Sequence, residues 1–196
     1  GARGHRSDTG IDPTDYSSSG YLKVTRGGGP FNLPAGVDIA PSGDIFIADG
    51  YGNCQVHRFS AEGEHLLSWG EPGSGPGQFM LPHGVRVDSR GNVLVADREN
   101  DRVQVFSQSG EFIAVWPSQL IGPAALYADA EDVVYVPEHN GGHFSVLSPD
   151  GEPLARWGSE ENKSCHGVAG DSHGDIYFVQ RIEAGQPRRL VKYVRR

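Results

Sequence analysis

The stretch from Asp49 to Arg102 decides the fold. It begins Asp49-Gly50-Tyr51-Gly52-Asn53, continues through Pro76-Gly77-Gln78-Phe79 and Leu81-Pro82-His83-Gly84, and reaches Ala96-Asp97-Arg98-Glu99-Asn100. The segment Leu81-Pro82-His83-Gly84-Val85 recurs in related form at intervals of 41 to 48 residues. The three other copies are Leu33-Pro34-Ala35-Gly36-Val37, Gly122-Pro123-Ala124-Ala125-Leu126 and Ser164-Cys165-His166-Gly167-Val168. Self-similarity at this period is typical of repeat architectures.

Each copy starts a unit of short strands joined by turns rich in Gly, Asn and Asp. Two apolar strands flank a tight turn and a third follows. In the first three units a fourth strand ends on Trp69, Trp116 or Trp157, and these tryptophans are expected to pack between units. Units of four short antiparallel strands at this period predict an all-β fold, a β-propeller. We expect four four-stranded blades at about 30–70, 79–116, 120–158 and 162–196, after a polar loop or linker over residues 1–29.

Length and composition limit the alternatives. The chain has 196 residues and a formal net charge of −8, so a nucleic-acid surface is not expected. No apolar run reaches the length of a membrane span. The two cysteines, Cys54 and Cys165, are too few for a disulfide framework and leave the compartment undecided. The four units are expected to belong to a six-bladed ring, with a closed four-bladed ring as the alternative.

The histidines at the strand starts point to a site. The first strand of a blade starts where its second strand ends, so residues at both places share one face near the central channel. The strand-start position is occupied by Ala35, His83, Ala124 and His166 in turn. In a six-bladed ring, histidines on every second blade would direct three imidazoles at one point, the geometry of a catalytic zinc site. The alternative is that His83 and His166 are ordinary turn residues.

Other residues of this face also carry candidate chemistry. Tyr51 could act as a base or hydrogen-bond donor near a metal, or pack the turn as an aromatic lid. Arg98 could hold a carboxylate, or form a salt bridge to Glu99 or Asp101. The repeating acidic residues Asp49 and Asp97 are expected to be strand-end hydrogen-bond acceptors. His5, His57 and His65 are expected at the surface, and His139 has no assigned role.

These residues carry a resemblance to the NHL-repeat family of six-bladed propellers, and more narrowly to the peptidyl-α-hydroxyglycine α-amidating lyase domains and their bacterial relatives. The matching motifs are Asp49-Gly50-Tyr51-Gly52-Asn53, Ser68-Trp69-Gly70, Pro76-Gly77-Gln78-Phe79, Pro82-His83 and Ala96-Asp97-Arg98-Glu99-Asn100. The resemblance implies a zinc held by three histidines on alternate blades, and cleavage of an α-hydroxyglycine-extended peptide into an amide and glyoxylate.

Carried over residue by residue, the resemblance makes His83 and His166 two of the zinc ligands, Tyr51 the proton-transferring base and Arg98 an active-site arginine. The first zinc histidine of the family would precede residue 1, so the resemblance implies zinc in the complete propeller and weak or absent binding by this chain. Calcium is not implied, because Gly167 stands where the animal lyases have an aspartate.

Two other functions remain open from the sequence. One is a non-catalytic NHL propeller that binds a peptide or protein on its channel face. The other is a propeller hydrolase such as a lactonase, which would need a carboxylate-rich metal site around residues such as Glu138. The expected partners are a small peptide-like substrate or a protein, with neither nucleic acid nor membrane. Self-association through open propeller edges is also expected.

Overall fold

The computed structural model describes residues 9–10, 23–29, 31–159, 165–180 and 189–195. Its strands form four antiparallel sheets that follow one another along the chain, and we number these sheets as blades 1 to 4. Blade 1 consists of β1 (Gly36–Ile39), β2 (Ile45–Asp49), β3 (Gln55–Phe59) and β4 (His65–Trp69). Blade 2 consists of β7 (Pro82–Val87), β8 (Val93–Asp97), β9 (Arg102–Phe106) and β10 (Phe112–Val115).

Blade 3 consists of β11 (Tyr127–Ala128), β12 (Val134–Glu138), β13 (His143–Leu147) and β14 (Pro153–Gly158). Blade 4 consists of β15 (Cys165–Gly170), β16 (Ile176–Gln180) and β17 (Arg189–Tyr193). A short parallel pair, β5 (Glu71–Pro72) and β6 (Gln78–Phe79), joins blades 1 and 2, and a 3-10 turn, η2, covers Arg98–Asn100. Within the described ranges no helix is long and apolar enough to cross a membrane.

The predicted all-β propeller fold is confirmed. Blades 1 to 3 have four strands each, and blade 4 has three in the residues that the structure describes.

The hairpin turns have the backbone geometry that their sequences predict. Between the first two strands of a blade, Gly43, Gly91 and Gly174 have φ values of 92°, 82° and 80°, and Asp132 takes the same position with φ 58°. Glycine reaches positive φ without steric cost, and aspartate tolerates it better than most residues. These short turns keep the strands in register, so both ends of each blade are well defined.

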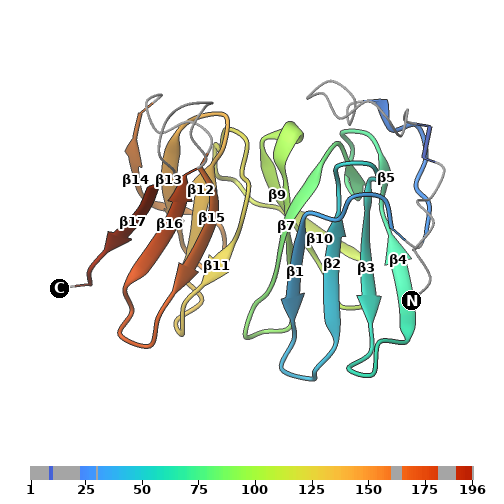
Figure 1. Ribbon diagram of the computed structural model, residues 1–196, viewed down its shortest axis with the longest axis horizontal. Helices are drawn as coiled ribbons and strands as arrows, with labels where there is room; N and C mark the ends of the chain where they lie inside the picture. The colour runs from blue at the N-terminus through green and yellow to red at the C-terminus, as the bar shows by residue number, and fades with distance from the viewer. Residues whose placement is uncertain (1–8, 11–22, 30, 160–164, 181–188, 196) are drawn as a thin grey trace.

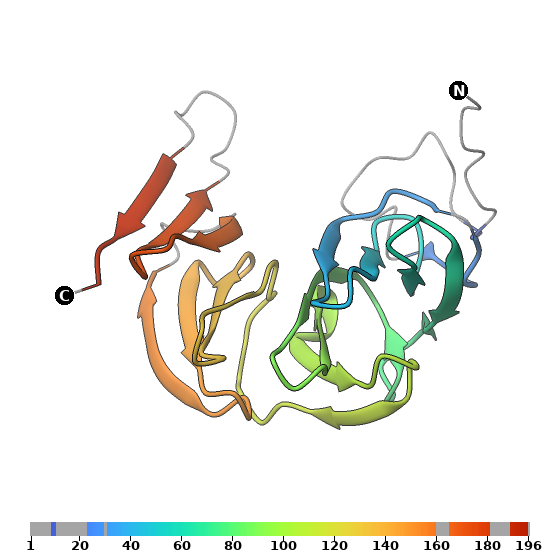
Figure 2. The same cartoon turned by 90° about the horizontal axis from the view of Figure 1, so that it is seen from below.

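The four blades follow one another along an open arc. Figure 2 shows the red blade 4 and the blue-to-teal blade 1 at its two ends, and Figure 1 shows the same separation from another side. Within the arc, β1 lies against β7, and β15 lies against β11 and β12. The first strands β1, β7, β11 and β15 therefore line the inside of the arc, as expected for the channel side of a propeller.

Apolar cores fill the spaces between successive blades. Phe46 of blade 1 and Phe106 of blade 2 belong to one core, and Leu94 and Val136 to the next. Phe144 and Phe178 belong to the third, between blades 3 and 4. The far side of blade 4 has no such cover in the described residues, and it exposes the apolar side chains Val179, Leu190 and Val194.

The predicted packing of the tryptophans between blades is confirmed. A Cβ atom built on Gly110 of blade 2 would lie 3.2 Å from the Trp69 ring of blade 1, and one on Gly151 of blade 3 would lie 2.1 Å from Cγ of Trp116. Each of these two indoles thus packs on a glycine of the next blade's outer turn. Trp157 packs between blades 3 and 4, against the rings of Phe144, Phe178 and Tyr193.

The glycine after each strand-start position tests this packing. A Cβ on Gly36 would lie 2.5 Å from the His83 carbonyl oxygen of the next blade, whereas a Cβ on Gly167 would meet only Val179 of its own blade, at 3.7 Å. We predict that Gly36→Ala destabilises the protein by about 1–3 kcal/mol, the typical cost of overpacking. Gly167→Ala, at the equivalent position, should change the free energy of unfolding by less than about 0.5 kcal/mol. Urea denaturation measures both, and equal losses would contradict the open end at blade 4.

Candidate functional site

His83 and His166 each lie in a β-bulge at the start of the first strand of their blade. In blade 2, Pro82 pairs with Asp97 and Gly84 with Ala96, so His83 is the extra residue of the strand. In blade 4, Cys165 pairs with Gln180 and Gly167 with Val179, which leaves His166 in the same position. A β-bulge re-aims the side chain of its extra residue, and bulges are frequent beside active sites. Both imidazoles thus leave the pleat of their sheets and enter the channel.

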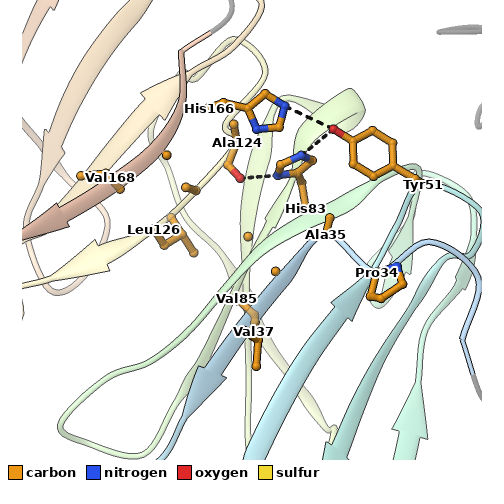
Figure 3. A pocket seen from close by; sticks show the side chains of 14 residues that line it. Pro34, Ala35, Val37, Tyr51, His83, Val85, Ala124, Leu126, His166 and Val168 are labelled. Carbon is orange, nitrogen blue, oxygen red and sulfur yellow. Dashed lines mark hydrogen bonds between the residues drawn. The ribbon is translucent and has the colours of Figure 1, made fainter. Parts of the chain in front are cut away.

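Tyr51 meets these two histidines. It follows β2 of blade 1, and a Cβ on the preceding Gly50 would lie 2.2 Å from the Pro82 carbonyl oxygen, so the absence of a side chain lets this turn lie on blade 2. The Tyr51 hydroxyl oxygen lies 2.8 Å from Nε2 of His83 and 3.3 Å from Nε2 of His166 (Figure 3). Residues from blades 1, 2 and 4 therefore converge on one oxygen atom.

The protonation of His83 follows from its surroundings. Its Nδ1 lies 2.5 Å from the Ala124 carbonyl oxygen, which can only accept, so Nδ1 carries the hydrogen and donates it. Nε2 of the neutral ring then presents its lone pair to the Tyr51 hydroxyl. Burial, helped by the positive charge of Arg98 and by His166, lowers the pKa of His83 from 6.5 to about 3. A neutral imidazole held by a backbone carbonyl is the state in which histidine binds a metal.

Arg98 forms the salt bridge to Glu99 that was one of its two expected contacts, and it also contacts Tyr51. Its Nε donates to Glu99 at 2.8 Å, the expected salt bridge, and its Nη1 donates to the Tyr51 hydroxyl at 3.2 Å. The guanidinium also lies over the Tyr51 ring, 5.4 Å from the centroid, and the residue is only 3% exposed. Arg98 therefore holds a buried positive charge beside the phenol oxygen.

A third imidazole lies beside this group. The His139 ring is 5.1 Å from that of His166, which is itself 4.7 Å from the His83 ring, measured between centroids. Sequence reasoning gave His139 no role, although it follows Glu138 just as Arg98 follows Asp97. Across the described residues, no group of three or more His, Cys, Asp or Glu side chains is arranged to hold a metal ion.

Residues at the first strands of all four blades line a solvent-open hollow of about 330 Å³ next to these residues. Its floor is formed largely by small residues, including Gly84, Ala124 and Gly167, which leave room beside His83, His166 and Tyr51. The hollow therefore offers a space for a small molecule at the group of polar side chains that the sequence placed on this face.

The strand-end acidic residues are structural, as predicted. Asp49 accepts hydrogen bonds from the Asn32 amide and the Asn53 side chain, and Asp97 accepts from the Met80 and Leu81 amides. Glu138 is fully buried. Its carboxylate accepts hydrogen bonds from Nε and Nη2 of Arg156, from the Ser145 hydroxyl and from the Ile121 amide. Glu138 is thus engaged in holding blade 3 together, which weakens the carboxylate-metal alternative.

One surface expectation was wrong. His57 is 1% exposed, because its ring lies between Asp49 and Ser68 inside blade 1. Repeat position is the signal that would have found it, since His57 occupies the third position of β3, where β9 has the buried Gln104. His65 is exposed as expected, and His5 lies outside the described residues.

Comparison with known proteins agrees with the repeat and the fold. NHL repeats match residues 31–59 and 79–106, which contain Tyr51, His83 and Arg98. The chain is 34% identical over 105 residues to peptidyl-α-hydroxyglycine α-amidating lyase 1 of Drosophila melanogaster, a match that covers 48% of this chain and 19% of the relative. It is 40% identical over 89 residues to human NHL repeat-containing protein 3, covering 44% and 26%. The chain thus has NHL repeats and is homologous to peptidylglycine α-amidating lyase and monooxygenase domains.

Among solved structures, virginiamycin B lyase from Staphylococcus aureus superposes with a TM-score of 0.61 at 17% identity, over 82% of this chain and 55% of that one. At this identity the likeness concerns the fold alone. The matched segments span about a quarter or less of the length of the curated relatives, so the activities of the whole relatives do not transfer directly.

The depressed pKa of His83 predicts a pH dependence of stability. Between about pH 6.5 and 3 the unfolded chain binds a proton at His83 that the folded chain does not, so stability falls as the pH falls through this window. We predict that His83→Gln lowers the slope of unfolding free energy against pH there by up to about 1.4 kcal/mol per pH unit. Urea titrations at several pH values measure this. His173→Gln, at a side chain that is 83% exposed, should leave the profile unchanged.

Proposed function

We propose that the channel face formed by Tyr51, His83, Arg98 and His166 is part of the zinc site of a lyase-like propeller. The reaction splits the C–N bond of an α-hydroxyglycine-type carbinolamide and releases an amide and glyoxylate. The observation that carries the proposal is the meeting of two imidazole nitrogens and a guanidinium at the Tyr51 oxygen. The homology to α-amidating lyases supports the substrate class.

The side chains fit two of the three protein ligands of a catalytic zinc. His83 is neutral and its Nε2 lone pair points at the Tyr51 oxygen, where Nε2 of His166 also arrives. Ala124 fixes the tautomer of His83, a typical arrangement for a metal-binding imidazole. Zinc held there would polarise the hydroxyl oxygen of the substrate. A third ligand has to come from His139 by rearrangement, or from chain outside these residues.

The protein residues have separable roles in this proposal. Tyr51 takes the proton of the substrate hydroxyl, whose electrons form the carbonyl of glyoxylate while the C–N bond breaks. Tyr51 then passes this proton to the leaving nitrogen, which becomes the amide, and the Tyr51 phenolate is restored. Arg98 stabilises the phenolate form that Tyr51 needs in order to act as a base, because its guanidinium is buried beside the Tyr51 oxygen and is held in place by Glu99.

We predict that this chain binds zinc weakly and that His83→Ala lowers its zinc affinity at least about tenfold, because two imidazoles fall short of the usual three protein ligands. Isothermal titration with zinc measures the affinity. His139→Ala, run in parallel, reports whether the third imidazole takes part, and the exposed His173→Ala is the control. Unchanged zinc binding in His83→Ala would refute the site.

Glyoxylate release from an α-hydroxyglycine-extended acyl substrate is the corresponding activity assay. We expect turnover by this chain alone to be low or absent, and any turnover to be lost in Tyr51→Phe. Activity that survives both Tyr51→Phe and His83→Ala would contradict the proposal. If the channel face instead bound peptides without cleaving them, the chain would be a binding module, the alternative that the sequence leaves open.

We further propose that the exposed side of blade 4 is covered by a second copy of the chain. Blades 1 to 3 bury apolar side chains against the next blade, whereas Leu190 and Val194 remain 67% and 63% exposed. We predict a concentration-dependent dimer by light scattering that Leu190→Lys weakens, while Ile113→Lys on the outer strand of blade 2 does not. A monodisperse monomer at all concentrations would rule out this association.

A further inference from the structure

A second group of polar side chains lies outside the channel, on β2, β3 and β4 of blade 1. Nδ1 of His57 lies 2.7 Å from the Ser68 hydroxyl oxygen, and Nε2 of His57 lies 3.3 Å from the Asp49 carboxylate. Nε2 of His65 also lies 2.7 Å from the same serine oxygen. An acid, an imidazole and a hydroxyl are therefore connected in one chain of hydrogen bonds.

The direction of these hydrogen bonds follows from their partners. Asp49 accepts from the Asn32 amide, the Asn53 amide group and His57, so Nε2 of His57 is the nitrogen that carries the hydrogen. Nδ1 then offers its lone pair, and the Ser68 hydroxyl donates to it. Because the single hydrogen of this hydroxyl is used in that bond, Nε2–H of His65 donates to the serine oxygen in turn. His57 is thereby oriented as a base toward Ser68, as in the acid–histidine–nucleophile arrangement of hydrolases.

The other blades show that this arrangement is not needed for the fold. At the position of His57, blade 2 has Gln104 and blade 3 has Ser145, and each of these contacts the acidic residue of its own blade. Neither residue is a base at neutral pH. Only blade 1, among the described blades, combines an imidazole at this position with a hydroxyl on the next strand.

A cavity gives access to the serine. A hollow of about 490 Å³ is lined by Ser68, His57 and His65 together with Gly28, Gly29, Gln55 and Phe59. Ser68 is partly exposed, whereas His57 is buried behind it and packs edge-on against Phe31 at 5.2 Å. Two glycines and one aromatic ring leave space for a small, mostly apolar group beside the hydroxyl.

We propose that Ser68 is a nucleophile activated by His57, with small carboxylic esters as its substrates. Ser68 Oγ bonds to the acyl carbon while its proton passes to Nδ1 of His57. The ester C–O bond breaks and the departing alcohol takes that proton. Water then hydrolyses the acyl-serine with His57 again as base, releasing the carboxylic acid. Asp49 is a positioning residue, since it holds the tautomer of His57 without touching the substrate. This site is independent of the channel site.

The test is covalent labelling with a fluorophosphonate probe, followed by mass spectrometry to locate the label. We expect the label on Ser68, none there in Ser68→Ala, and a labelling rate at least about 100-fold lower in His57→Gln, the scale of general-base catalysis. Ser107→Ala is the control, because this hairpin serine contacts Ser109 and no imidazole, and it should be labelled at Ser68 like the wild type. Absence of label on Ser68 in the folded wild type would overturn the proposal.

Two further measurements distinguish a Ser68 nucleophile activated by His57 from simpler explanations of the same reactivity. Release of p-nitrophenol from p-nitrophenyl acetate should be lost in Ser68→Ala; if it is instead lost only in His65→Ala, the exposed imidazole alone reacts and the proposal fails. Nitrogen-15 NMR of the His57 ring reports the tautomer directly. A hydrogen on Nε2 is expected, whereas a hydrogen on Nδ1 would mean that the ring cannot accept the serine proton, and would also overturn the proposal.

Discussion

Each of the first three blades depends on the hydrogen bonds of a buried acidic residue at the end of its second strand. This residue is fully buried in all three cases, and a buried carboxylate is tolerated only when it is paired and hydrogen-bonded. Each carboxylate accepts backbone N–H groups from the segment that enters the first strand and pairs with a side chain from the third or fourth strand. The residues are Asp49 with His57, Asp97 with Arg102, and Glu138 with Arg156.

This pairing positions the channel residues without prescribing them. The hydrogen bonds of the buried carboxylate hold the start of the first strand next to the end of the second strand. The strand-start residue and the residues that follow the acidic residue therefore lie side by side. The bulge then turns His83 into the channel, where the equivalent residue of blade 3 is Ala124, whose carbonyl oxygen accepts the His83 hydrogen. The same strand-start position thus carries the candidate ligand His83 in blade 2 and the apolar residue Ala124 in blade 3. Such a difference is expected when a functional site is added to a repeat fold.

Packing between blades depends on a different constraint, which is close approach of backbones. Gly36 and Gly84 have no room for a side chain because the next blade's backbone lies against them, and Gly110 and Gly151 receive the indoles of the preceding blade. At blade 4 the equivalent Gly167 has free space and apolar residues face outward. In the described residues, the close backbone approach that joins successive blades is therefore absent at this edge of blade 4.

The sequence by itself determined the strands, the turns and the face that carries Tyr51, His83, Arg98 and His166, because these follow from the repeat period and from which strand ends coincide. Only the tertiary structure decided that His83 and His166 share the Tyr51 oxygen, that His139 lies beside them, and that the His57 ring contacts the Ser68 hydroxyl. Periodicity describes each blade alone, whereas these contacts join residues of different strands or blades. Their distances depend on how closely the backbones pack and where the bulges turn the side chains, and neither quantity is encoded in the spacing of residues along the chain.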